Sequence, residues 1–288
     1  MKRTTESTPR VREGLALVGA RQPLGSYIRS VWDRRGFAWI MALYANEAKT
    51  AHTRLGRWWT IIQPTIQVSI YGLIFGFILG ANKPDNFLPY LFTGVFFFTF
   101  MSGCLVAGSK AITGNSGLVT SINFPRVILP VQTVIRQMVT FIQTLPILLI
   151  LVLGYEILVF KTIKWEIVLL PIPIVLMAFF GFGVAATAAR MHARLRDLDQ
   201  LIPFMNRVLF YASGVFFSID KALEGHPFWA AAMRINPFYD FMELARGALV
   251  TGYSWDWSLA LVCLVWAIVA PVFGLIFFWR GEETYGNR

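Results

Sequence analysis

Long apolar windows alternate with short polar links along the 288-residue chain. A helix of about 20 apolar residues crosses the ~30 Å hydrocarbon core of a bilayer. Six windows have this length, and they lie at about 58–80, 88–108, 127–154, 165–189, 201–219 and 258–279. The pattern therefore predicts an all-α integral membrane protein with six transmembrane helices, which together form one transmembrane domain over residues 58–279.

The segment before the first window, residues 26–52, has the pattern of an amphipathic helix. Val31 and Trp32 lie on one helical row that Trp39 and Leu43 continue, while most charged residues lie elsewhere. A helix of this kind lies in the membrane interface rather than across it. Packing on the cytosolic ends of the spans is the other interpretation, and the two are compatible.

Charge sets the expected orientation. Only 15% of the residues are charged and 56% are hydrophobic, against roughly 25% charged in a soluble domain. Most of the 26 Lys and Arg residues lie before residue 58, near 109–126 and 190–200, or in the tail 280–288. Positive residues stay in the cytoplasm, so both termini are expected there, with residues 1–25 as a cytosolic tail and no signal peptide. This asymmetry accounts for much of the +10 net charge, so no nucleic-acid partner is expected.

Two links between windows contain short helical patterns. The cytosolic link near 109–126 breaks at a Gly-Asn-Ser-Gly run and then has a short apolar stretch that stops at Phe124-Pro125. A helix there either docks a separate subunit or lies on its own chain. The outer link predicts two short helices near 227–235 and 238–250, and Pro237 suits the first turn of the second.

Enzyme signatures are absent from the sequence. It has no phosphate-binding G-x-x-x-x-G-K-[ST] loop, no G-x-S-x-G elbow, no H-E-x-x-H and no C-x-x-C. Cys104 and Cys263 lie in separate apolar runs and the three histidines are far apart, so neither a metal site nor a catalytic set is predicted. The chain is therefore expected to be neither an ATPase nor another enzyme.

A polar row runs along the third window. Gln132, Arg136, Thr140 and then Gln143 or Thr144 recur at helical spacing on one face. Arg136 lies about 13 Å into the window by helical rise, near the bilayer midplane. A charge at that depth faces protein or water rather than lipid. The row is either the wall of a hydrophilic path, with Arg136 as a contact for a lipid phosphate, or a structural set bonded to neighbouring helices.

Several short motifs, in this order and at these places, point to one family. They are Leu55-Gly56-x-x-Trp59 with Pro64, Tyr71 and Phe75; Gly117-Leu118-Val119 through Asn123-Phe124-Pro125-Arg126 with Pro130; Arg196-Asp197-Leu198; and Asn236-Pro237 with Arg246. With these motifs the chain resembles the ABC-2 type permease subunits that export polysaccharides and polyol-phosphate polymers such as O-antigen, teichoic acid and galactan. Thr120 and Ser121 depart from the family, which has basic residues there.

The resemblance implies a homodimer in the bacterial inner membrane with two copies of a separate ATPase that holds ATP and Mg²⁺. No cofactor is expected on this chain. Segment 26–52 would be the interface helix. The cytosolic coupling helix would use Gly117, Leu118, Val119, Ile122, Asn123 and Phe124, and the short periplasmic re-entrant gate helices would use Asn236, Pro237 and Arg246.

The implied substrate is a cell-surface polysaccharide on a polyprenyl (pyro)phosphate lipid; the long basic N-terminus favours an actinobacterial galactan precursor of cell wall biogenesis. Aromatic rings stack on sugars, so Tyr71, Phe75, Tyr211 and Phe217 join Gln132, Arg136 and Thr140 as candidates for the translocation path, although packing and lipid contact are the commoner roles of such rings. An ABC-2 permease for drugs or small lipids, or an integral-membrane glycosyl- or acyltransferase, are the alternatives.

Overall fold

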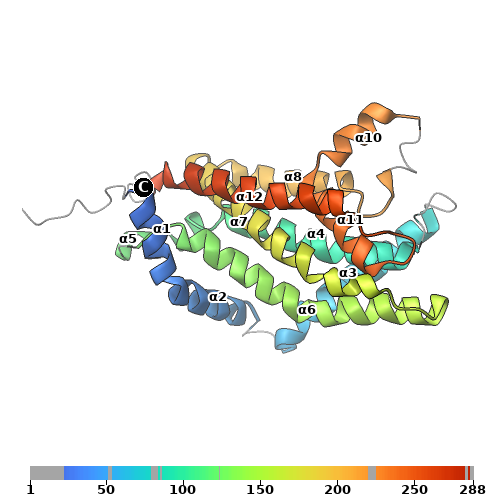
Figure 1. The fold of residues 1–288 in the computed structure, drawn as a ribbon. Helices are drawn as coiled ribbons and strands as arrows, with labels where there is room; N and C mark the ends of the chain where they lie inside the picture. The colour runs from blue at the N-terminus through green and yellow to red at the C-terminus, as the bar shows by residue number, and fades with distance from the viewer. Residues whose placement is uncertain are drawn as a thin grey trace, which may run out of the picture.

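The structure, a computed structural model, describes residues 23–50, 54–78, 84, 86–122, 124–219, 225–282 and 285. Within these ranges the chain is helical and contains no strand. Figure 1 shows the long helices side by side along one direction, with α1 (Leu24–Asp33), α5 (Ser116–Ser121) and the C-terminal end at one end of the bundle. α10 (Pro227–Arg234) lies toward the other end. The prediction of an all-α fold is confirmed.

Five described helical segments are long and apolar enough to cross a membrane. They are α3 (Trp59–Ile78), α4 (Phe87–Ser109), α6 (Ile128–Phe160), the η4–α7 segment (Trp165–Leu169 and Pro171–Arg194) and α12 (Trp257–Trp279). These segments correspond to the first four predicted windows and the sixth. A multi-pass membrane protein is therefore the class that both the sequence and the structure support.

The fifth predicted window, 201–219, contains a shorter helix. α8 (Leu198–Ala212) has 15 residues, which rise only about 22 Å against the ~30 Å of a hydrocarbon core. Ser213 and Gly214 end it, and Gly214 has a φ of 62°, a left-handed conformation that glycine adopts without steric cost. The backbone from there to 218 is irregular. Hydropathy detected the apolar run but not the turn inside it.

The tightest packing in the bundle joins α7 to α12. A β-carbon at Gly274 of α12 would lie 2.5 Å from the carbonyl oxygen of Gly183 on α7, and one at Gly183 would clash with the backbone of Ala270. On the other side of α7, a β-carbon at Gly108 of α4 would lie 2.6 Å from Cα of Ala185. Small residues thus bring three helices into backbone contact, as is common between membrane helices.

The predicted 26–52 helix forms two helices instead of one. α1 ends at Arg34, whose backbone leaves the helical region, and α2 (Arg35–Thr50) then runs beside α6 (Figure 1). Tyr27, Ala38 and Ala42 are buried against the bundle, whereas Trp32 and Tyr44 are 68% and 69% exposed. The exposed aromatic rings suit a membrane interface, and the buried row shows that the segment also packs on its own chain.

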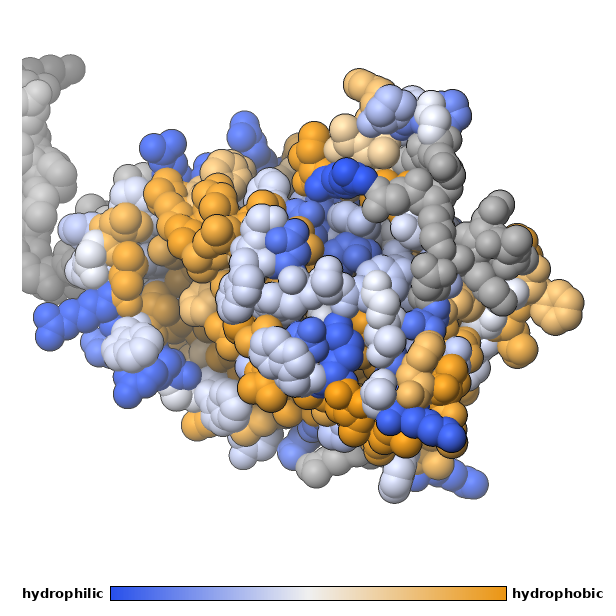
Figure 2. All heavy atoms as spheres, turned by 45° about the vertical axis from the view of Figure 1, so that its right-hand side comes forward, coloured by the Kyte–Doolittle hydropathy of each residue, from blue (hydrophilic) through white to orange (hydrophobic). Residues whose placement is uncertain are grey.

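Two short helices follow α8, at α10 and at α11 (Pro237–Leu249). α10 is exposed, with Phe228 and Trp229 on its surface, whereas α11 is largely buried between α4, α7 and α12. Figure 2 brings this end of the molecule forward and shows polar side chains gathered at its centre, with apolar side chains along the flanks. This distribution fits a bundle whose end faces water and whose sides face lipid.

Candidate functional site

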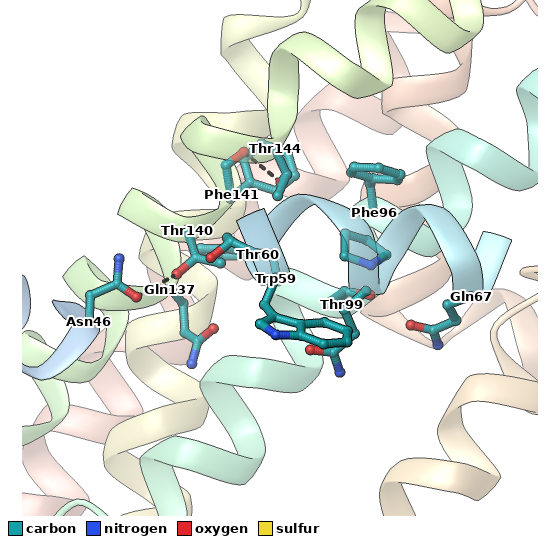
Figure 3. A pocket seen from close by; sticks show the side chains of 13 residues that line it. Asn46, Trp59, Thr60, Gln67, Phe96, Thr99, Gln137, Thr140, Phe141 and Thr144 are labelled. Carbon is teal, nitrogen blue, oxygen red and sulfur yellow. Dashed lines mark hydrogen bonds between the residues drawn. The ribbon is translucent and has the colours of Figure 1, made fainter. Parts of the chain in front are cut away.

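A cavity of about 410 Å³, with amide and hydroxyl groups set in a mostly apolar wall, opens between α2, α3, α4 and α6 (Figure 3). Its wall consists of amides, threonine hydroxyls, aromatic rings and one proline. The lining residues are Asn46, Trp59, Thr60, Gln63, Pro64, Gln67, Phe96, Thr99, Phe100, Gln137, Thr140, Phe141 and Thr144. None of these described lining residues carries a charge, and their amides and hydroxyls can bind water or a polar solute.

The α3 wall follows from helical spacing. Thr60, Gln63 and Gln67 lie three and four residues apart and therefore share one face. Pro64, within this face, has no N–H, so the helical hydrogen bond to the carbonyl of Thr60 is missing. Gln67 Nε2 donates to Oη of Tyr71, one turn further along, at 3.3 Å. The polar face of α3 thus continues into its aromatic residues.

The α6 wall carries three polar residues of its own, Gln137, Thr140 and Thr144. Oγ1 of Thr140 lies 3.4 Å from Oδ1 of Asn46 and 3.0 Å from the carbonyl oxygen of Arg136. The side chain of Gln137 packs against Gly103 of α4, so closely that a β-carbon at Gly103 would lie 2.5 Å from its Oε1 atom. The glycine therefore leaves the room that the amide occupies.

Thr99 marks where the cavity reaches α4. It is exposed, whereas its neighbours Phe98 and Phe100 are buried. Its Oγ1 atom donates to the carbonyl of Val95 at 2.7 Å, which leaves the oxygen lone pairs free to accept. Phe96 and Phe100 provide the apolar part of this wall.

The predicted polar row of the third window divides between two environments. Thr140 and Thr144 line the cavity, but Gln132 is buried outside it and Arg136 is half-buried outside it. Gln137 lines the cavity instead. α6 has 33 residues, about 50 Å of rise, and Arg136 lies only about 12 Å from its start rather than near its middle. Gln137, Thr140 and Thr144 also form an i, i+3, i+7 row, so the sequence allowed this face as well.

Three of the four predicted path aromatics meet in one ring cluster. Phe75 stacks on Phe216 with ring centroids 4.0 Å apart, and Tyr71 lies 5.1 Å from the same ring. Tyr211 lies 6.0 Å from it. Phe217 is half-buried and has no ring contact in the described structure; its carbonyl accepts from Oη of Tyr90 at 2.9 Å. The cluster joins α3 to the irregular segment after α8.

Arg246, a predicted gate residue, lies fully buried on α11. Its Nη1 atom is 2.6 Å from Oε1 of Glu243, and its guanidinium carbon lies 3.4 Å from the ring centroid of Tyr90. Nη2 donates to the carbonyl of Gly214 at 3.1 Å. A β-carbon at Gly94 would lie 2.5 Å from Nη2. Arg246 therefore ties α11 to α4 and to the turn after α8.

The other two predicted gate residues shape the start of α11. Oδ1 of Asn236 accepts from the N–H of Phe238 at 3.0 Å as an N-cap, and its Nδ2 atom donates to Oγ of Ser213 at 2.7 Å. Pro237 occupies the first helical position. Both residues hold α11 against the end of α8.

The far end of α11 is held by two charged residues that the motifs did not indicate. Nζ of Lys164 donates to the carbonyls of Gly247 and Tyr253, each at 2.6 Å, a favourable place for a cation at a helix C-terminus. Burial lowers the pKa of the Lys164 ammonium. The buried Glu156 accepts from the N–H of Thr251 at 2.9 Å. Only the folded chain brings these residues to one helix end.

The predicted coupling segment is partly buried by its own chain. Val119 and Phe124 are buried, and the ring of Phe124 lies 6.0 Å from that of Phe37 on α2. Leu118 is half-buried, whereas Gly117 and Ile122 are exposed. Asn123 lies outside the described residues. The surface left for a partner is therefore smaller than the sequence pattern suggested.

A second hollow, of about 320 Å³, lies beside α5. At its wall, Oδ1 of Asp199 is 3.2 Å from Nζ of Lys110, and Oδ2 is 3.3 Å from Nε2 of the buried His192. The side chains of Lys110 and Asp199 are both exposed, so this ion pair is solvated. No group of three potential metal ligands occurs in the part of the chain that the structure describes.

Comparison with known proteins agrees with this geometry. Residues 40–250 match the family model described as ABC-2 type transporter. The chain is 24% identical over 217 residues to the O-antigen export system permease protein RfbA of Myxococcus xanthus, covering 75% of this chain and 80% of the relative. It is 25% identical over 256 residues to the polysialic acid transport protein KpsM of Escherichia coli, covering 85% and 94%. The resemblance drawn from the motifs is confirmed.

Proposed function

This chain belongs to the ABC-2 type transporter family, and from that premise we propose that it is the permease subunit of an ATP-driven exporter of a cell-surface polysaccharide. The observation that carries the proposal is the polar cavity, which continues along one face of α3 through Gln67 and Tyr71 into the aromatic cluster. Alternating hydroxyl, amide and ring surfaces suit a sugar polymer, because sugars present hydroxyl edges and apolar faces.

The polymer class is supported by the relatives, whose names refer to O-antigen export and polysialic acid transport. We extend the proposal to a polymer carried on a polyprenyl (pyro)phosphate lipid, with the galactan precursor of an actinobacterial cell wall as the specific candidate. Arg136, half-buried beside the cavity on α6, is the proposed contact for the lipid phosphate. Tyr71, Phe75 and Tyr211 are the proposed aromatic steps of the path.

The proposed assembly has two copies of this chain and two copies of an ATPase in the inner membrane. The sequence has no phosphate loop of its own, so hydrolysis must occur on another chain. The exposed Ile122 beside α5 is the proposed centre of ATPase docking. We propose that both termini lie in the cytoplasm, as the Lys and Arg distribution predicts, and that α8 with the irregular segment after it forms a sixth crossing. Asn236, Pro237 and Arg246 hold α11 as a gate on the outer side.

The test is depletion of this chain in its host, with quantification of surface polysaccharide and of lipid-linked polymer inside the cell. Export predicts that surface polymer falls while lipid-linked polymer accumulates. Unchanged surface polysaccharide after depletion would overturn the proposal. Purification provides a second test, because the chain should retain a P-loop ATPase and should show no hydrolysis once that partner is removed.

A further inference from the structure

The wall of the cavity combines uncharged polar groups with a larger share of apolar surface. Four amides and four threonine hydroxyls supply its polar groups, and four aromatic rings supply most of the rest. The charged side chain next to it in sequence, Arg136, does not line it. A cavity of about 410 Å³ between these helices thus has donors and acceptors of hydrogen bonds but no charge among its described lining residues.

Two of the amides have all their hydrogen-bonding groups available for a ligand. Gln63 and Gln137 make no side-chain hydrogen bond within the described structure, whereas Gln67 donates one N–H to Tyr71. An amide group has two N–H donors and an acceptor oxygen. A sugar hydroxyl also donates and accepts, so these amides can donate a hydrogen bond to a sugar hydroxyl or accept one from it.

An anionic polymer would meet an unfavourable environment in the same place. Carboxylate and phosphate groups are bound in proteins by Arg and Lys, which supply charge-assisted hydrogen bonds. A charge that leaves water without such a partner loses hydration that neutral amides only partly replace. The aromatic surfaces of Trp59 and Phe96 add nothing for an anion, but they can pack against the apolar face of a sugar ring.

From these observations we propose that the cavity between α2, α3, α4 and α6 binds uncharged sugar residues of the cargo, and that the exported polymer is a neutral polysaccharide rather than a polyanion. This inference rests on the proposed export function and adds the substrate class. The lipid phosphate stays outside the cavity on the side of Arg136, while the sugars next to it enter among Gln63, Gln67 and Gln137.

The experiment places a photo-crosslinking amino acid at Thr99, the exposed position of α4 in the cavity wall. The control position is Leu73, which is 71% exposed on α3 and does not line the cavity. Cells that carry the complete exporter are irradiated, the chain is purified, and the attached sugar is released and analysed. We expect neutral sugars at Thr99 and none at Leu73.

A polymer that contains sialic, uronic or phosphate groups at Thr99 would overturn the neutral-cargo proposal, and absence of sugar at Thr99 would overturn the cavity as a sugar site. Neither result touches the proposed function, which fails only if depletion leaves surface polysaccharide unchanged.

A second variant tests whether the amides themselves bind the sugar. Gln137→Leu, combined with the crosslinker at Thr99, should lower the captured sugar about fivefold, the equivalent of roughly one lost hydrogen bond. The thermal stability of the purified chain is measured beside it, because the side chain of Gln137 also packs against Gly103 of α4. Unchanged capture at unchanged stability would show that the amide does not contact the cargo.

Discussion

α3 and α12 are apolar helices of similar length, with 20 and 23 residues, but they meet the bundle in different ways. Gly274 brings α12 into backbone contact with Gly183 of α7, with no room for a β-carbon. α3 buries a single side chain, Val68, and leaves a polar cavity between itself and α4 and α6. The α7–α12 contact resembles a protein core, whereas α3 resembles one wall of a passage.

The difference indicates where the molecule can move. Close-packed helices cannot separate or slide without losing many contacts at once. α3 has less contact to lose when it shifts, because it buries only Val68 and its other contacts are the cavity wall, the ring cluster and leucine and phenylalanine side chains of α4. We infer that α3 adjusts to the cargo while α4, α7, α11 and α12 form the fixed frame.

The largest effect is expected at the buried charge of this frame. Glu243→Gln removes the carboxylate that faces the fully buried Arg246, and an uncompensated buried charge costs about 3–5 kcal/mol. Thermal unfolding of the purified complex measures the loss. Asp33→Asn, at an exposed position of α1, is the control. Arg246→Met combined with Glu243→Gln should recover much of the stability. If Glu243→Gln alone had wild-type stability, the claim that this ion pair stabilises the fixed frame would be wrong.

The next effect is expected at the α7–α12 contact. Gly183→Ala forces a methyl group against the backbone of Ala270 and should lower stability by about 1–3 kcal/mol, as overpacking does. The matched control is Gly154→Ala on α6, where nothing lies within 4 Å of the new β-carbon and the substitution should be neutral or stabilising. Equal melting temperatures for the two variants would show that the backbones separate freely.

On the α3 side, export should change more than stability. Gln67→Leu removes the amide that lines the cavity and contacts Tyr71. We expect a loss of about 1 kcal/mol in cargo interaction, roughly fivefold in affinity. Surface polysaccharide and the melting temperature are measured together. Leu73→Ala, on the exposed face of the same helix, should leave export intact. If Gln67→Leu lowered the stability as much as Gly183→Ala does, α3 would belong to the fixed frame rather than to a mobile wall.

The smallest effect on the permease fold is expected at Ile122, which is 51% exposed beside α5. Ile122→Asp should leave the melting temperature within about 0.5 kcal/mol of wild type but should weaken ATPase retention, since a carboxylate is poorly tolerated in an apolar contact. Phe124→Asp is the contrasting variant, because Phe124 is buried and its loss should unfold the segment. Wild-type ATPase recovery with Ile122→Asp would exclude this docking surface.

Much of the architecture was readable from the sequence, because a bilayer imposes a length and a composition on every helix that crosses it. Five of the six predicted windows coincide with helices long enough to cross, and the two short helices near α10 and α11 were indicated by Asn236-Pro237. Hydropathy could not show that Gly214 shortens the helix of the fifth window, since a turn within an apolar run leaves the average unchanged.

The site depended on tertiary structure. Helical spacing grouped Thr140 with Arg136, but the same spacing allows other polar rows on α6. The orientation of α6 against α2 and α4 turns the row with Gln137 and Thr144 toward the cavity. Arg246 was marked by a motif, and its partner Glu243 lies one turn earlier on the same helix, but Tyr90 lies on α4 and becomes a neighbour only after packing. The sequence by itself determined which segments are apolar enough to cross a membrane, because that depends on local composition. Only the packed bundle decided which polar side chains share a cavity, because that depends on how each helix is rotated against the next.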